Sequence, residues 1–382
     1  MSDRNPAPAD PGIGRSPLLT DGVVAALLAT MGPNTPLDTM YRHLLVPIDS
    51  SDRSIELVSN AVCLARAVDA RITFFHTHHH PAAGPQPEAP WRGQQAQGGE
   101  DGAGRTRELL AKAEAAARAC GVPCDSMHAV SDRPGPAILE ASRVTGCDLV
   151  FMAVHDAHCP PAMASASGTL GDLMNAGLSV LVPSSDAPRA PAHAIGILRD
   201  EHRSMAAVLH AWMDRLSRAR TPGVPPDTTL MQAMLRYLHD FPLAVHHPKE
   251  EAHLFSLLRE RDPTLGPELD ELQRQHRRDQ ALLAGLAQRL AALAEAGDGA
   301  ARATALRELD EAVQAYAAFL WNHLGREEAV ILPAAQRCLT ADDWDYIDAA
   351  FARQRDPGFG TDIEQACRQL FSRIVDADPG VH

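Results

Sequence analysis

The fold predicted for the second half of this 382-residue chain rests on a sequence phrase that occurs twice. It reads His246-His-Pro-Lys-Glu250-Glu-Ala-His-Leu-Phe255, and again His323-Leu-Gly-Arg-Glu327-Glu-Ala-Val-Ile-Leu332. Each copy places a glutamate pair four residues after a histidine, and an apolar pair follows. Residues four apart lie one above the other on a helix, so each phrase predicts an imidazole and a carboxylate directed at the same point.

Four long helical patterns surround the two phrases. They run over residues 194–217, 228–261, 265–296 and 300–337, and the short breaks between them contain Pro222, Asp262-Pro263 and Gly297-Asp-Gly299. Short connections between apolar-striped helices are typical of an up-down bundle. The first and third helices carry His202 and His276 within their apolar stripes, where a polar ring needs an internal partner.

The four helices together predict a metal site in the bundle core. They offer His, His and Glu, His, and again His and Glu, which is the donor set of a dinuclear, carboxylate-bridged centre. Imidazole and carboxylate without thiolate suit iron or manganese better than a closed zinc site. Glu251 and Glu328 lie about 100° further around their helices, and we expect them to point away and take no part in the site.

Residues 194–340 resemble the hemerythrin-like (HHE cation-binding) family, whose signature is H, HxxxE, H, HxxxE. The resemblance implies a non-heme, oxo-bridged di-iron cofactor with Glu250 and Glu327 as bridges. The implied ligands are His202, His246, Glu250, His276, His323 and Glu327. His247 is a possible extra ligand: overlaying the phrases favours His246, whereas the spacing of His247 from Leu243 and Leu254 favours His247.

One position departs from the oxygen-carrying members of that family. They have a fifth histidine four residues after the third-helix ligand, where this chain has Gln280. Four imidazoles, two bridging carboxylates and a shared oxo group leave about one open position on each of two octahedral irons. The resemblance therefore points to the members linked with nitric oxide, peroxide, iron handling or iron-sulfur repair rather than to simple oxygen carriage.

Strand and helix signals alternate in the first half of the chain. Strands are expected near residues 43–49, 71–75, 126–130, 148–154 and 179–183, and helices near 54–68, 106–120, 137–145 and 170–176, with a loop over 81–104. This rhythm predicts a parallel sheet covered by helices on both faces. The fold class is α/β followed by all-α.

Residues 41–184 resemble the universal stress protein family, which implies a five-stranded sheet and pairing into a homodimer through this domain. The resemblance rests on His43-Leu-Leu-Val-Pro-Ile-Asp49, Asp148-Leu-Val-Phe-Met-Ala153 and Leu178-Ser-Val-Leu-Val-Pro183. Nucleotide-binding members follow their fourth strand with GxxG, a spacer and G[ST], because glycine lets the backbone approach phosphate. Here Ala153-Val-His-Asp156 replaces the first glycines. Asp49, Gly168 and Thr169 remain as candidate nucleotide-binding residues, but we expect no tight ATP binding because the first glycines are missing.

A run of histidines closes the second expected strand. His76, His78, His79 and His80 stand directly before Pro81. Both a surface metal site and a solvated loop mouth are compatible with such a tract.

Composition excludes several classes of protein. Lys plus Arg is 35 and Asp plus Glu is 49, so the net charge of −14 disfavours binding to nucleic acid or to an anionic membrane. No apolar run reaches the length of about 18 residues that spans a membrane. Neither lysine, Lys112 or Lys249, stands in a P-loop. Seven cysteines without a CxxC pair predict reduced thiols, and we place the protein in the cytoplasm.

The remaining segments are expected to carry no chemistry. Residues 1–40 form a flexible leader without signal-peptide features, 185–193 a linker, and 341–382 a helical tail. The leading interpretation is a stress-related di-iron protein whose bundle binds or senses oxygen, nitric oxide or peroxide. The alternatives are a di-iron enzyme or iron donor, and a nucleotide-responsive stress protein.

Overall fold

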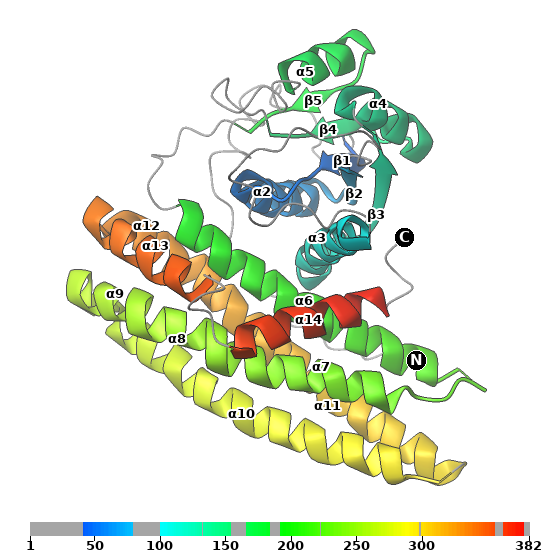
Figure 1. Cartoon of the computed structure of the whole chain (residues 1–382), viewed down its shortest axis with the longest axis vertical. Coiled ribbons are helices and arrows are strands. Elements are labelled where there is room, and N and C mark those ends of the chain that lie inside the picture. Colours follow the sequence, from blue (N-terminus) through cyan, green and yellow to red (C-terminus); the bar gives the residue numbers. More distant parts are fainter. Residues whose placement is uncertain are drawn as a thin grey trace, which may run out of the picture.

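The computed structural model describes residues 41–78, 100–131, 133–153, 166–183, 192–221, 223–297, 299–355 and 362–377. The expected leader, nearly all of the expected linker and the stretch Val154 to Asp156 lie outside these ranges. A sheet domain lies above a helical bundle in Figure 1, and the helices α2 and α3 lie between them.

The first domain is the expected five-stranded parallel sheet. Its strands are β1 (His43–Pro47), β2 (Arg71–His78), β3 (Cys124–Val130), β4 (Leu149–Phe151) and β5 (Val180–Leu181). They pair in the order β3-β2-β1-β4-β5, and every pair is parallel. The order reverses between β1 and β4, so the carboxyl ends of these two strands meet at a switch point of the kind where α/β proteins bind ligands.

Helices cover both faces of this sheet. The helices α2 (Asp52–Val68) and α3 (Glu100–Ala119) pack on the face that carries Leu44, Val46 and Phe74. The helices α4 (Pro134–Thr145) and α5 (Ala166–Asn175) pack on the face that carries Leu45 and Phe75. Because successive strand residues point to opposite faces, continuous apolar strands fill both layers. The helix α3 begins before its expected start, within the expected loop.

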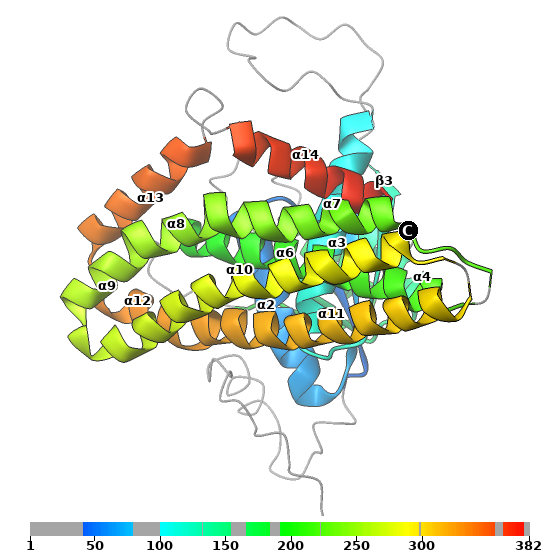
Figure 2. The ribbon, with the colours of Figure 1, turned by 90° about the horizontal axis from the view of Figure 1, so that it is seen from below.

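The second domain is a ring of four helical rods. The first rod is α6 (Ala192–Ala219), and the second consists of α7 (Thr228–Phe241), α8 (His247–Lys249) and α9 (Ser256–Arg261). The third rod is α10 (Gly266–Glu295). The fourth is α11 (Ala300–Arg326), which α12 (Leu332–Cys338) continues. Contacts run from α6 to α7, α7 to α10, α10 to α11, and α11 back to α6. Figure 2 shows these rods side by side, which confirms the expected four-helix bundle.

Both histidine-glutamate phrases lie in or next to wide π-helical turns. These turns cover Pro242–His246, Glu250–Phe255 and Glu327–Ile331. The sequence predicted unbroken α-helix there. Pro248 and Pro333 lack the backbone N–H that an α-helical ladder uses, which favours a local change of hydrogen-bond pattern. Such π-helical insertions are frequent at functional sites.

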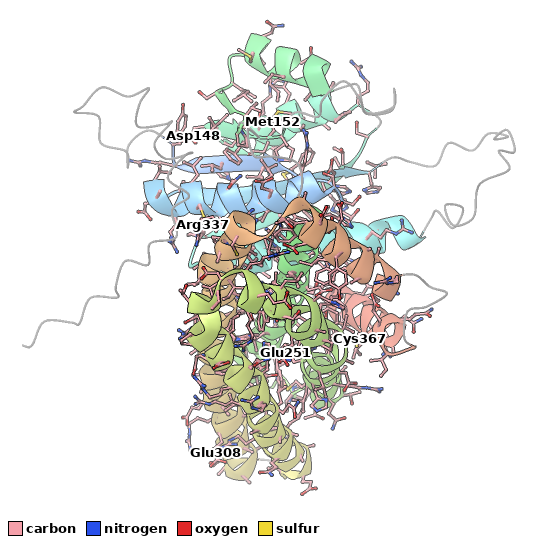
Figure 3. All side chains as sticks on the ribbon, turned by 90° about the vertical axis from the view of Figure 1, so that its left-hand side faces the viewer. Asp148, Met152, Glu251, Glu308, Arg337 and Cys367 are labelled. Atoms are coloured by element: carbon pink, nitrogen blue, oxygen red, sulfur yellow. The ribbon has the colours of Figure 1, made fainter. Side chains whose placement is uncertain are left out.

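The helix α6 belongs to both domains. It contacts α7 and α11 of the bundle and also α2 and α3 of the sheet domain. No residue from 194 to 216 is exposed, as expected for a helix covered on every side. Figure 3 places Glu251 in the bundle below the sheet domain, which carries Asp148 and Met152.

Two further helices form the tail. The helix α13 (Ala341–Arg355) packs on α6 and on the π-helical turn at Glu250–Phe255, and α14 (Asp362–Asp376) packs on α7, α3 and α6. Among the described residues, no helix is long and apolar enough to cross a membrane.

Candidate metal centre

Four buried histidines, one from each rod of the bundle, direct a ring nitrogen into one space. His202 comes from α6, His246 from the π-helical turn before α8, His276 from α10 and His323 from α11. Each is at most 4% exposed. The Nε2 atoms of all four are buried and have no hydrogen-bond partner.

Two glutamates lie between these histidines. Glu250 Oε2 is 3.5 Å from His246 Nε2 and 3.6 Å from His276 Nε2. Glu327 Oε1 is 3.2 Å from His323 Nε2 and 3.6 Å from His276 Nε2, and its Oε2 is 3.3 Å from His202 Nε2. Glu250 Oε2 and both oxygens of Glu327 also lack an aligned hydrogen bond. The structure therefore brings together all six residues that the sequence singled out.

The second ring nitrogen of each histidine is held by another side chain. The Nδ1 atoms of His202, His246, His276 and His323 lie 2.9, 2.9, 2.6 and 3.0 Å from oxygens of Glu328, Glu201, Glu251 and Gln275, respectively. A carboxylate or amide oxygen only accepts, so each Nδ1 donates, and each Nε2 is left with its lone pair.

This arrangement corrects one expectation. Glu251 and Glu328 do take part in the site, through the outer nitrogens of His276 and His202. The expectation that they point away assumed α-helical geometry, but each lies in a π-helical turn. Sequence reasoning also missed Glu201 and Gln275, although Glu201 directly precedes His202 and Gln275 directly precedes His276.

A buried ion pair supports His246 from behind. Lys249 is completely buried, and its ammonium group pairs with Glu201, the residue that accepts the hydrogen bond of His246. Burial opposes ionisation of Glu201, but the hydrogen bond from His246 and the charge of Lys249 lower its pKa to about 2. Glu201 is thus held as a carboxylate that fixes the His246 ring.

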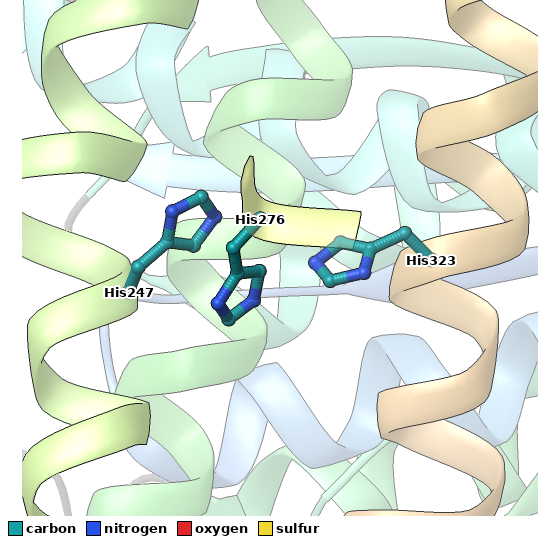
Figure 4. A group of neighbouring side chains, drawn as sticks. All are labelled: His247, His276 and His323. Carbon is teal, nitrogen blue, oxygen red and sulfur yellow. The ribbon is translucent and has the colours of Figure 1, made fainter. Parts of the chain in front are cut away.

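His247 lies beside the second pair of histidines. Its ring stacks on that of His276 with centroids 3.7 Å apart, and it belongs with His276 and His323 to a group whose nitrogen atoms lie within 4.8 Å of one another. Figure 4 shows the three rings converging from different helices. His202, His246, Glu250 and Glu327 form a second such group. The cluster thus has two lobes.

The electrostatics of the cluster favour a cation. Burial and the neighbouring Glu327 raise the pKa of Glu250 well above its usual range. Burial has the same effect on Glu327, but the adjacent His323 and His202 outweigh it and hold its pKa well below that range. Each buried polar atom without a partner costs about 1–3 kcal/mol. Seven such atoms converge in this space, and a bound cation would satisfy them together, so the residues fit a metal.

Two family models match the chain, one after the other. The universal stress protein family model matches residues 40–166, and the model of the hemerythrin HHE cation binding domain matches residues 193–335. The chain joins a universal stress protein domain to a hemerythrin HHE domain. Both resemblances expected from the sequence are confirmed in that order.

Two solved structures are similar to part of the chain. One is a universal stress protein family member from Burkholderia pseudomallei, 19% identical, over 38% of this chain and 97% of that one, with a TM-score of 0.29. The other is a universal stress protein in complex with cAMP, 17% identical, over 38% of this chain and 98% of that one, also with a TM-score of 0.29. A comparison with curated proteins found no significant match.

Next to the cluster, the hemerythrin domain buries a second polar pair. Asp279, one turn after His276 on α10, is buried, and so is Tyr316 on α11. Burial raises the pKa of Asp279 to about 6 and that of Tyr316 well above its usual value. Gln280, where oxygen carriers have their fifth histidine, is exposed. Sequence reasoning considered Gln280 and missed its buried neighbour.

In the universal stress protein domain, Asp49 lies in the turn that starts α2. Its Oδ1 accepts hydrogen bonds from Ser51 N at 2.9 Å, Ser51 Oγ at 2.5 Å and Ser54 Oγ at 2.7 Å. Gly168 lies in the first turn of α5, and the adjacent Thr169 is buried. A Cβ placed on Gly135 of α4 would lie 3.3 Å from Thr169 Oγ1, so Thr169 packs tightly against α4.

Proposed function

We propose that the hemerythrin domain binds a pair of iron ions, and that the chain is a stress-related non-heme di-iron protein that binds or senses oxygen, nitric oxide or peroxide. One observation carries the proposal. Four Nε2 atoms and three carboxylate oxygens, all buried and without hydrogen-bond partners, converge from four helices. Buried nitrogen and oxygen atoms without a hydrogen-bond partner lower the stability of the fold unless they bind a ligand such as a metal ion.

The two lobes of the cluster support an assignment of ligands. His202 and His246 would hold one ion and His276 and His323 the other, because each pair has its ring centroids 4.9 Å apart. Glu250 and Glu327 lie between the pairs and would bridge them. His247 is available as an additional ligand in the second lobe. When bound, a ferrous pair supplies electrons and open coordination positions to a small ligand.

The chain's own side chains shape the surroundings of that site. Phe319 stacks alongside His323 and Phe255 alongside His276, with centroids 6.3 and 6.1 Å apart. These rings give the second lobe an apolar side. Asp279, with a pKa of about 6, is a buried group that can hold a proton one turn from His276. Such a group suits a site that admits peroxide or reduces its ligand.

Metal analysis of the purified full-length protein tests the proposal. We expect about two irons per chain, near-ultraviolet charge-transfer absorption in air, and a changed spectrum when nitric oxide is added to the reduced protein. Glu327→Ala should lower the iron content because it removes a bridge. Glu311→Ala, at an exposed glutamate on α11, the helix that leads directly into Glu327, is the matched control. One tightly bound zinc without iron in metal-replete cells would contradict the proposal.

The universal stress protein domain has a separate proposed role. We propose that it forms a homodimer and connects the bundle to a stress response in the cytoplasm. The six described cysteines form no disulfide with one another, which supports a reducing compartment. Asp49 Oδ1 is engaged in the turn before α2, which supports our expectation that ATP does not bind tightly.

A further inference from the structure

One of the outer hydrogen bonds of the candidate metal centre lies deep in the protein. Glu201, which accepts from His246 Nδ1 at 2.9 Å, has a side chain that is 9% exposed. The side chains of Glu251 and Glu328, which hold two of the other histidines, are 40% and 38% exposed. Water can solvate those two carboxylates, whereas protein groups have to hold the carboxylate of Glu201 in place.

Lys249 holds the second oxygen of the Glu201 carboxylate. Its ammonium group pairs with Glu201 Oε1, whereas Glu201 Oε2 accepts the hydrogen bond from His246. Lys249 is completely buried. Because the two oxygens have different partners, the ion pair fixes the rotation of the carboxylate, and the carboxylate in turn fixes the direction of the His246 ring.

The tail helix α13 provides part of the surroundings of this ammonium group. Phe351 of α13 is completely buried, and Lys249 Nζ lies over its ring, 5.9 Å from the centroid. At this distance the negative face of an aromatic ring attracts a cation. The helix α13 also contacts α6, which carries Glu201, and the π-helical turn that begins directly after Lys249. A continuous chain of contacts thus leads from the tail to the metal centre.

We propose that Phe351 and Lys249 are positioning residues of the metal centre, through which the tail helix α13 helps to orient a metal ligand. Phe351 places the ammonium group of Lys249, which holds the Glu201 carboxylate. That carboxylate then directs Nε2 of His246 into the first lobe of the cluster. The proposal rests on the function proposed above for the bundle, and it gives the tail a role that the sequence did not predict.

The hydrogen bond of His246 can be followed without any metal. In metal-free, full-length protein with ¹⁵N-labelled histidine, a buried Nδ1–H group that donates to a carboxylate should exchange slowly with water and give its own proton NMR signal. The signal of His246 is assigned by its loss in His246→Ala. Phe351→Leu keeps the position apolar but removes the ring face, so we expect this proton to exchange about 10-fold faster. The signals of the other three ligand histidines should stay unchanged.

Tyr346→Leu is the matched control. Tyr346 is an exposed aromatic residue on the same helix, and its ring packs against that of His253. Its replacement should leave the His246 signal as it is in the wild type. An unchanged exchange rate in Phe351→Leu would overturn the proposal, and so would an equal acceleration in Tyr346→Leu.

Iron affinity tests whether this orientation matters for the metal. Competition with a chelator should show an affinity about 10-fold lower in Phe351→Leu than in the wild type. In the double variant Glu201→Gln with Lys249→Met, a neutral pair replaces the buried ion pair, and Phe351 no longer has an ammonium group to place. Adding Phe351→Leu to that variant should therefore leave its iron affinity unchanged.

The two measurements distinguish the positioning role from the proposed function. A further loss of about 10-fold on adding Phe351→Leu to the double variant would show that Phe351 acts through stability alone, and would overturn the proposal. Absence of iron from every variant, with the expected NMR result, would contradict the metal-binding function and still support the positioning of His246.

Discussion

When a histidine binds a metal through one ring nitrogen, the hydrogen bond of its other ring nitrogen fixes the orientation of the ring. In this bundle, the four Nδ1 atoms donate to oxygens of four different residues. Of these four residues, only Glu251 and Glu328 belong to the repeated phrases. The glutamate pair of each phrase therefore contributes twice, with its first carboxylate inside the cluster and its second on a histidine of another helix.

Replacing Glu328 tests this double use. Glu328→Ala removes the acceptor of the His202 Nδ1 hydrogen bond, so we expect iron affinity to fall by about 10- to 100-fold. Chelator competition measures the affinity, and Glu311→Ala serves as the control. An unchanged affinity would mean that Glu328 points away from the site, as regular α-helical geometry requires.

A second residue-scale prediction separates His246 from His247. His246 is fully buried next to Glu250, and its Nδ1 is fixed by Glu201, whereas His247 is less buried and stacks on His276. We expect His246→Ala to lose most of the iron. His247→Ala should keep the iron and alter the spectral response to nitric oxide. The reverse order of iron contents would make His247 the primary ligand.

The spacing of the six cluster residues was enough to find them in the sequence. Histidine and glutamate four residues apart recur twice, and no knowledge of tertiary packing is needed to see that they share a face. The outer partners could not be found in this way. Glu201 reaches His246 across 45 residues, and Glu328 reaches His202 across 126, so those pairings exist only once the helices are packed.

At the scale of elements, the π-helical turns account for most differences from the sequence prediction. The sequence prediction assumes a constant rotation around the helix axis from each residue to the next. A π-helical turn has more residues per turn, so the residues after it point in other directions than the prediction assigns. The prolines at positions 242, 248 and 333 are the only sequence signal near these turns. Proline marks a disturbed helix but does not tell whether the chain kinks, breaks or widens. The strand and helix order itself followed from the apolar pattern.

One contact fixes the tail helix α13 to the bundle. Arg261, at the end of α9, donates from Nε and Nη2 to the Asp343 carboxylate at 2.9 and 2.8 Å. Thr340 N donates to the same carboxylate at 2.8 Å. The hydrogen bonds from Arg261, followed by those from Thr340, lower the pKa of Asp343, although burial opposes them.

This contact predicts a dependence of stability on pH. A carboxyl group whose pKa is lowered by folding stabilises the protein above its unfolded pKa of about 4, and the contribution disappears as the pH falls through the folded value. Asp343→Asn should therefore melt below the wild type near neutral pH, and the two melting temperatures should converge in acid. Asp342→Asn, an exposed neighbour, is the control. A constant difference down to about pH 3 would contradict this prediction.

At the scale of the whole molecule, Arg203 joins the domains beside a candidate ligand. It follows His202 on α6 and is buried, and its Nη2 donates to the carbonyl oxygen of Ile55 at 2.5 Å and to Ser59 Oγ at 2.8 Å, both on α2. Two residues before His202, Asp200 pairs with Lys112 of α3 at 2.7 Å. The sheet domain thus holds α6 on both sides of His202.

Arg203→Ala should weaken both the fold and the metal site. Losing hydrogen bonds from a buried charged group should cost about 1–3 kcal/mol in denaturant unfolding, and iron affinity should fall because α6 is less firmly held at His202. Arg220→Ala removes an exposed arginine directly after α6, with its ion pair of 3.1 Å to Asp310 of α11, and should change neither quantity much. Equal effects of the two variants would show that α6 is not anchored at His202.

The outer face of the sheet domain bears on assembly. Val144 on α4 and Met174 on α5 are 69% and 63% exposed, and Figure 1 shows these two helices on the side of the sheet domain away from the bundle. We expect the wild type to elute as a dimer and Val144→Asp to shift toward the monomer when followed by light scattering. Val330→Asp, at an exposed valine of the bundle, should leave the dimer intact. A monomeric wild type would refute this prediction.

The burial of α6 on every side, from residue 194 to residue 216, limits how the two halves of the chain can be separated. A truncated chain that is cut between the two domains leaves α6 in only one of them. The face of α6 that packs on the other domain then becomes exposed, and so does the surface of that domain which α6 covered. Recombination that exchanged only the sheet domain would need a new partner surface for Arg203 and its neighbours on α6. The two halves should therefore be engineered as one unit.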